Sequence, residues 1–233
     1  MPSLQGIQAI TFDVGGTLIH PWPSVGHVYS QVAARHGHPN LPADTLNHQF
    51  AAAWAAKGAF KHSRGEWLAL VKQTFAGMLA DAAVEKLFNP LYAYFAKRES
   101  WEVFEDVHPA LAELRRNELL LGIISNWDER LRPLLRDLKL SQYFAVTIIS
   151  IEAGFAKPER AIFQRAVDLL GVPAESILHV GDSFAEDAAG GQSAGMRTLL
   201  LDRRDKTDPA RSHDLTRAIP DLTCLPRMLQ VAG

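Results

Sequence analysis

Apolar residues follow two different spacings along the chain, and each spacing predicts its own kind of structure. Near the amino terminus and again after residue 100, short and almost continuously apolar runs alternate with stretches of helical spacing. Such runs are typical of strands buried on both faces of a sheet. Strands that alternate with helices predict a doubly wound, Rossmann-like parallel sheet with right-handed crossovers. The expected strands are the run from Ala9 up to Asp13, then 119–124, 144–151, 177–180 and 197–201.

Residues from about 24 to 98 show no strand pattern and favour helices. Apolar positions recur at helical spacing in four stretches, which start near Val28, Pro42, Arg64 and Asp81. Four short amphipathic helices joined by short loops predict an all-helical insert. We therefore expect a sheet domain of residues 1–20 and 101–233 and a helical domain of residues 21–100. The aromatic residues expected in the core of the helical domain are Trp54, Trp67, Phe75 and Tyr92.

The second half of the chain also carries signals for helix ends and loops. Pro158 is expected as the first residue of a helix that ends at Leu170, before Gly171. Another helix is expected from near Phe184 to about Gly195. The polar stretch 202–214 predicts a surface loop, and a terminal helix is expected near 225–231.

Composition narrows the classes of protein that the chain can be. A formal net charge of -2 and a pI near 6.5 argue against a nucleic-acid-binding surface. A single cysteine excludes an intrachain disulfide, and no apolar run approaches the roughly 20 residues of a membrane span. With no signal-type segment at the start, we expect a cytoplasmic protein. The sequence does not indicate its oligomeric state.

The first strand ends in the stretch with the clearest chemistry. Asp13 follows the strand, and Gly15, Gly16 and Thr17 come directly after it. Open α/β sheets bind ligands at the carboxyl ends of their strands, and glycines let the backbone approach an anion closely. The stretch therefore indicates a nucleophile beside a small anion-binding loop, with a simple turn capped by Asp13 as the alternative.

Polar groups also follow three later strands. Ser125 and Asn126 follow the second strand, Lys157 lies on the loop after the third, and the fourth ends at Asp182, with Asp187 close behind. Because the carboxyl ends of parallel strands share one edge, these groups are expected to converge on Asp13. Taken singly, each has a structural alternative as a helix cap, a first-turn acid or a solvated loop charge. His179 and Trp127 flank these positions, and we interpret them as structural neighbours, with a contact behind the site residues or in the lining of the cleft as the alternative.

In this order and spacing the motifs resemble those of the haloacid dehalogenase (HAD) superfamily. The family signature is an Asp-x-x-Gly-Thr loop, a Ser or Thr after the second strand, a Lys, and Gly-Asp followed by a further acid. The corresponding residues here are Asp13–Thr17, Ser125, Lys157 and Gly181–Asp187. The resemblance covers almost the whole chain and implies that the helical insert is a cap domain.

The resemblance implies a Mg²⁺-dependent phosphatase for a small phosphorylated molecule. Asp13 would attack phosphorus to form an aspartyl-phosphate, while Ser125 and Lys157 hold the phosphoryl group. Oxygen ligands suit Mg²⁺, and Asp187 would act on it directly, through water or through Lys157. The implied metal ligands are Asp13, the Gly15 carbonyl, Asp182 and Asp187. The implied substrate-binding residues are Gly16, Thr17, Ser125, Asn126 and Lys157.

One position departs from the family pattern. Family phosphatases usually carry a second Asp two residues after the nucleophile as general acid and base, and here that residue is Gly15. Such a group contributes about 10²–10⁴-fold to the rate. The substitution predicts a preference for phosphate esters with acidic leaving groups. It also leaves two alternatives open: a metal-free hydrolase like the 2-haloacid dehalogenases, which lack the second Asp too, and a catalytically weak phosphate-binding or interaction protein.

Overall fold

The chain forms two compact units in the computed structural model, which describes residues 4–203 and 218–230. The first unit contains Met1–Ile19, Val103–Asn126 and Lys139–Gly233, and we call it the sheet unit. The second contains His20–Glu102 and Trp127–Leu138, and we call it the helical unit.

The sheet unit is built on a parallel sheet of six strands in the order β5-β4-β1-β6-β7-β8. The α/β fold class predicted from the apolar runs is therefore confirmed. The strands are β1 (Ala9–Phe12), β4 (Leu120–Ser125), β5 (Val146–Ile149), β6 (Ile177–Gly181), β7 (Arg197–Leu201) and β8 (Ala218–Ile219).

Strand β1 lies inside the sheet, between β4 and β6, and all of its residues are buried. Its register places Thr11 beside Gly122 of β4 and beside His179 of β6. Since β1, β4, β5 and β6 run in the same direction, their carboxyl ends meet at one edge of the sheet. That edge carries the polar groups predicted to form the site.

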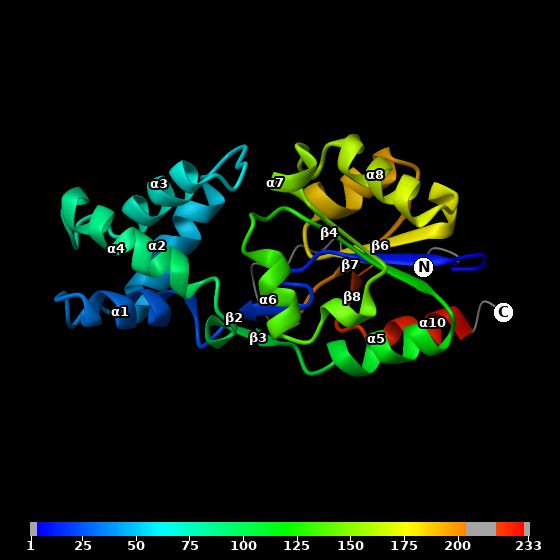
Figure 1. Ribbon diagram of the computed structural model, residues 1–233, viewed down its shortest axis with the longest axis horizontal. Helices are drawn as coiled ribbons and strands as arrows, with labels where there is room; N and C mark the ends of the chain where they lie inside the picture. The colour runs from blue at the N-terminus through cyan, green and yellow to red at the C-terminus, as the bar shows by residue number, and fades with distance from the viewer. Residues whose placement is uncertain (1–3, 204–217, 231–233) are drawn as a thin grey trace. The chain divides into compact units, whose positions relative to one another are not determined.

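Helices cover both faces of the sheet, as a doubly wound fold requires. In Figure 1, α8 (Arg160–Leu170) lies on one face, and α5 (Val107–Arg116) and α10 (Cys224–Gln230) lie on the other. Helix α8 packs on β4 and β5 through a core that includes Ile162, Phe163 and Ala166.

The sequence predicted the end of α8 correctly but not its start. The predicted end is confirmed, because Gly171 adopts a left-handed conformation (φ +69°) as the residue after the helix. The predicted start at Pro158 is wrong, because Glu159 is still non-helical and α8 begins at Arg160. The Glu159 carboxylate accepts a hydrogen bond from the Ala156 amide, which closes a turn before the helix.

Two further predictions need correction. The strand expected over 144–151 ends at Ile149, and Ser150–Ala153 forms a short helix, α7, that stops at the left-handed Gly154. The helix expected from Phe184 begins with a π-helical turn, Phe184–Ala189, and continues as α9 (Gly190–Ser193). In that turn the Ala188 amide bonds the Ser183 carbonyl five residues back, at 3.2 Å.

Three short strands were not predicted. Strand β8 has two residues, and β2 (Ile19–Pro21) and β3 (Trp101–Val103) pair in a separate sheet. Runs of two or three residues carry no periodicity that could have indicated them. Of the predicted surface loop 202–214, Asp202 is in fact buried, and residues from 204 onward lie outside the described part, as does residue 231 of the predicted terminal helix.

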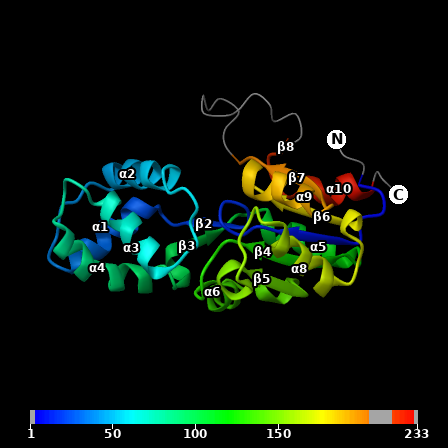
Figure 2. The same ribbon diagram turned by 90° about the horizontal axis from the view of Figure 1, so that it is seen from above.

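The helical unit contains the four predicted helices, which Figure 2 shows grouped together. Phe75 and Tyr92 are buried in their shared core and Trp67 packs against it, whereas Trp54 is only half-buried and stacks on Phe50. Ser63 and Glu66 form a capping box that starts the third helix. The helices are α1 (Val25–Arg35), α2 (Ala43–Ala55), α3 (Arg64–Thr74) and α4 (Asp81–Tyr94).

The segment after Asn126 also groups with the helical unit, although the predicted boundaries place it in the sheet domain. The Trp67 indole donates to the buried Asp128 carboxylate at 3.0 Å. Asp128 pairs with Arg130, whose guanidinium lies 3.6 Å from the centre of the Tyr92 ring. These contacts fasten the start of α6 (Leu131–Asp137) to the helices. Within the described residues, no helix is long and apolar enough to cross a membrane.

Candidate active site at the carboxyl edge of the sheet

The loop after β1 is a tight turn that requires glycine at one position. The Gly16 amide donates to the Ile19 carbonyl at 2.9 Å, and the Leu18 amide donates to the Val14 carbonyl at 2.8 Å. Gly16 has φ +77°, and a Cβ added there would collide with the Asp182 carboxylate. Glycine at this position therefore permits both the turn and the approach of Asp182.

Asp13 is the buried centre of a group of polar side chains. One of its carboxylate oxygens, Oδ1, accepts hydrogen bonds from the Ser125 hydroxyl at 3.1 Å and the Lys157 ammonium at 2.6 Å. Ser125 ends β4, and Lys157 comes from the loop that follows β5 and α7. The structure thus brings to Asp13 two side chains that lie 112 and 144 positions away from it in the sequence.

Lys157 bridges two carboxylates. Its Nζ lies 2.6 Å from Asp13 Oδ1 and 2.5 Å from Asp187 Oδ1, and only 1% of its side chain is exposed. Burial favours the neutral amine, but the two carboxylates outweigh it and raise the pKa of Lys157 above its ordinary value. The ammonium therefore stays charged and holds the two acids at fixed positions.

Three carboxylates gather around this one ammonium. Oxygen atoms of Asp13, Asp182 and Asp187 lie within 4.8 Å of one another. Burial raises the pKa of Asp13, with Lys157 opposing the shift. Asp182 keeps solvent access, yet the protein atoms around its carboxyl, and next the Asp13 charge, raise its pKa to about 7. Burial opposes ionisation of Asp187, but Lys157 and His179 prevail and lower its pKa.

This arrangement fits a divalent cation. Three acids against one ammonium leave excess negative charge, and hard carboxylate oxygens are the ligands that Mg²⁺ prefers. Gly15 has no side chain, so its backbone carbonyl is the oxygen through which it could take part. The residues that could hold the ion are those that the sequence predicted: Asp13, Gly15, Asp182 and Asp187.

Asn126 is placed differently from the other predicted substrate-binding residues. Its side-chain amide accepts from the Lys157 backbone amide at 2.7 Å and donates to the Lys157 carbonyl at 2.9 Å. It also donates to Glu186 at 3.1 Å. The polar atoms of Asn126 are thus engaged with the protein, and they fix the backbone of the residue that carries the ammonium.

The backbone amides of Gly16 and Thr17 are likewise used inside the loop, by the Ile19 and Val14 carbonyls. The Thr17 side chain is fully buried, and its hydroxyl has no hydrogen-bond partner among the described residues. These two residues shape the loop. Their predicted contact with substrate stays a prediction.

Two buried residues, Thr11 and His179, lie behind the acids; the sequence analysis interpreted His179 as a structural neighbour and gave Thr11 no role. His179 Nε2 lies 3.1 Å from Asp187 Oδ1, and His179 Nδ1 lies 2.9 Å from the Thr11 hydroxyl. The Ser183 amide donates to the other Asp187 oxygen at 3.0 Å. A polar side chain in the middle of a wholly buried strand needs a hydrogen-bond partner. This requirement is the only feature of the sequence that could have indicated a role for Thr11.

The fold and the motifs together define a class of protein, which comparison with known proteins identifies. Residues 7–195 match the family model of the haloacid dehalogenase-like hydrolases, and the chain belongs to this family. It is 35% identical over 210 residues to haloacid dehalogenase-like hydrolase domain-containing protein 3 of Danio rerio, covering 85% of this chain and 86% of that protein.

Two solved structures extend the comparison. The HAD phosphatase from Thermococcus onnurineus superposes with a TM-score of 0.67 at 24% identity, covering 96% of this chain and 98% of that one. The 2-haloacid dehalogenase from Pseudomonas syringae superposes with a TM-score of 0.66 at 25% identity, covering 97% and 100%. These superpositions show the shared fold, and the two proteins compared are named a phosphatase and a dehalogenase.

Proposed function

We propose that this hydrolase is a Mg²⁺-dependent phosphatase that acts on a small phosphorylated molecule. The observation that carries the proposal is the acid cluster beside Lys157: Asp13 has a cation-binding partner in Asp182 and a phosphate-binding partner in Lys157. An enzyme that displaces halide without a metal has no use for a third carboxylate at this point.

The reaction follows from the placement of the side chains. The Asp13 carboxylate attacks phosphorus, an acyl-phosphate bond forms, and the bond between phosphorus and the ester oxygen breaks. Lys157 and Ser125 donate to phosphoryl oxygens, which stabilises charge that grows in the transition state. Water then hydrolyses the aspartyl-phosphate and restores Asp13. Bound Mg²⁺ would supply charge neutralisation between the carboxylate and the phosphate.

Gly15 determines which substrates react well under this proposal. It offers no proton to the leaving oxygen, which must take one from water or from the substrate itself. Esters whose leaving group is already acidic do not need that proton. We therefore propose aryl or acyl phosphates as better substrates than alkyl phosphates. We further propose that the enzyme acts in the cytoplasm and that residues 21–100 form a cap that selects the substrate.

The test is release of phosphate from p-nitrophenyl phosphate with and without Mg²⁺. We expect turnover that needs Mg²⁺ and is lost in Asp13→Asn, which keeps the size of the side chain and removes the nucleophile. Asp182→Asn should raise the Mg²⁺ concentration needed. Turnover that is equal in chelator, or unchanged in Asp13→Asn, would contradict the proposal.

One specific observation favours a second function. The 2-haloacid dehalogenase from Pseudomonas syringae is 25% identical, and Gly15 is compatible with an enzyme that needs no acid at this position. Halide release from a 2-haloacid in the presence of chelator would support this function. Binding of phosphate with no turnover of either substrate would instead indicate a phosphate-binding protein.

A further inference from the structure

Thr11 and His179 form a polar pair in the interior of the sheet. They face each other across the β1–β6 register, and both are fully buried. The Thr11 hydroxyl and His179 Nδ1 lie 2.9 Å apart. Side chains alternate along a strand, so Thr11 points to the same face as Asp13. The pair therefore lies on the face that carries the nucleophile, one step deeper in the sheet.

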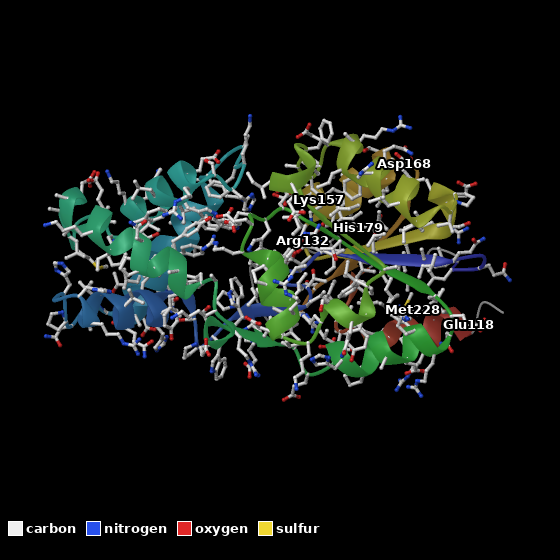
Figure 3. All side chains as sticks on the ribbon, in the orientation of Figure 1. Glu118, Arg132, Lys157, Asp168, His179 and Met228 are labelled. Atoms are coloured by element: carbon white, nitrogen blue, oxygen red, sulfur yellow. The ribbon has the colours of Figure 1, made fainter. Side chains whose placement is uncertain are left out.

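The second ring nitrogen of His179 reaches the acid cluster. His179 Nε2 lies 3.1 Å from Asp187 Oδ1, and this same oxygen receives the Lys157 ammonium at 2.5 Å. A carboxylate can only accept, so Nε2 must carry the hydrogen. Figure 3 labels Lys157 and His179, which come from different segments and meet at this one oxygen.

The ring and the carboxylate are held in shape by what surrounds them. The Phe163 ring stands edge-on to His179, with centroids 5.2 Å apart. A Cβ at Gly181 would collide with the Asp187 carboxyl, and one at Gly191 would lie 3.5 Å from the His179 Cβ. The Phe163 ring and the hydrogen bonds at both ring nitrogens hold the imidazole with Nε2 directed at Asp187.

We propose that Thr11 and His179 are positioning residues for the reaction centre. A continuous series of hydrogen bonds runs from Thr11 through His179 and Asp187 to Lys157, and it ends on Asp13. Thr11 orients the imidazole, the imidazole orients Asp187 Oδ1, and that oxygen sets where the ammonium of Lys157 stands beside Asp13. The effect on turnover rests on the proposed function, whereas the hydrogen-bond series does not.

The test uses substitutions that remove or keep hydrogen bonds of this series. Thr11→Val keeps the shape and deletes the hydroxyl, Thr11→Ser keeps a hydroxyl, and His179→Leu deletes the ring nitrogens. We expect kcat to fall about 10–100-fold in His179→Leu, the usual cost of losing a partner behind a metal ligand. We expect about a fivefold fall in Thr11→Val, restored by Thr11→Ser. KM should change little, because neither residue touches substrate.

A matched control lies on the next strand. Thr198 pairs with His179 in the β6–β7 register, but its hydroxyl bonds the exposed Gln192 at 3.0 Å and not the acid cluster. Thr198→Val, like Thr11→Val, removes a threonine hydroxyl from a residue paired with His179, and it should keep wild-type kcat. A fall in kcat equal to that of Thr11→Val would show that the effect is general loosening of the sheet and would overturn the proposal.

Nitrogen NMR of the histidine rings tests the series without any assay of turnover. His179→Leu identifies the His179 signals, which should show hydrogen on Nε2 in the wild type and should move in Thr11→Val. Added Mg²⁺ should shift the His179 signals in both the wild type and Thr11→Val. A bare Nε2, or signals unaffected by Thr11→Val, would refute the series even in an active enzyme. If the signals behave as expected and no phosphate ester is hydrolysed, the proposed function fails instead.

Discussion

Replacing Lys157 by methionine should destabilise the protein strongly and in a manner that depends on pH. The substitution keeps an unbranched side chain of similar length and removes the only cation that contacts both Asp13, at 2.6 Å, and Asp187, at 2.5 Å, among the described residues. Two buried carboxylates would then face each other and Asp182 without a counter-charge. Removing one partner of a buried ion pair typically costs about 3–5 kcal/mol, because the remaining charge is left uncompensated.

Proton uptake gives an independent estimate of the same cost. A carboxyl with an ordinary pKa near 3.9 can be neutralised at pH 7 for about 1.4 kcal/mol per pH unit, or about 4 kcal/mol for one proton. The variant should therefore lose about 4 kcal/mol at pH 7, and about 1.5 kcal/mol at pH 5. The sign follows from the folded-state pKa, which the substitution raises: the folded variant binds protons more readily than the unfolded chain, so its stability recovers as pH falls.

The measurement is urea unfolding in chelator at both pH values, followed by circular dichroism. Lys72→Met is the control, because Lys72 also has two carboxylate partners, Asp81 at 3.2 Å and Glu85 at 2.6 Å, but in an exposed setting. It should change stability far less than Lys157→Met, because exposed ion pairs are screened by water and contribute little. If Lys157→Met resembles Lys72→Met at pH 7, or if its loss does not shrink at pH 5, the assignment of Lys157 as the essential counter-charge is refuted.

Three further outcomes follow from the site. Gly16→Ala should abolish phosphate release and lower the melting temperature, because the left-handed φ of +77° and the contact with Asp182 both exclude a Cβ; Gly37→Ala, also left-handed but with open space around it, separates the two causes. The rise in melting temperature caused by Mg²⁺ should grow from about pH 6 to about pH 8, because Asp182, with a pKa of about 7, must lose its proton to bind the ion; a rise that is equal at both pH values would contradict a metal role for this acid. A series of phosphate esters should react faster as the leaving group becomes more acidic, because Gly15 supplies no proton; equal kcat/KM for aryl and alkyl esters would show that another group supplies one.

The sequence was most informative where chemistry and strand ends coincide. Asp13, Ser125 and Asp182 each follow an apolar run, and the rule that parallel strands share one carboxyl edge was enough to bring them together. Helix ends marked by glycine were equally readable, as at Gly171. These signals are local, and they need no knowledge of which strands are neighbours.

The contacts that could not be predicted from the sequence depend on how the strands align and on hydrogen bonds between residues far apart in the chain. The pairing of Thr11 with His179 follows from the alignment of β1 with β6, which no local pattern encodes. The two hydrogen bonds of Asn126 to the Lys157 backbone, 31 positions away, could not be predicted from the sequence, and its contact with substrate stays a prediction. Asp128 and Arg130 follow a site strand, yet their partners Trp67 and Tyr92 belong to the helical unit.

The division of the chain into two units has a practical consequence for spectroscopy. All five tryptophans, Trp22, Trp54, Trp67, Trp101 and Trp127, belong to the helical unit, and the sheet unit has none. Tryptophan fluorescence therefore comes from the helical unit alone, whereas the acids and Lys157 belong to the sheet unit, which contains no tryptophan. Phe184 is 71% exposed and lies beside the acid cluster. A tryptophan introduced at this position would place a fluorescent reporter in the sheet unit.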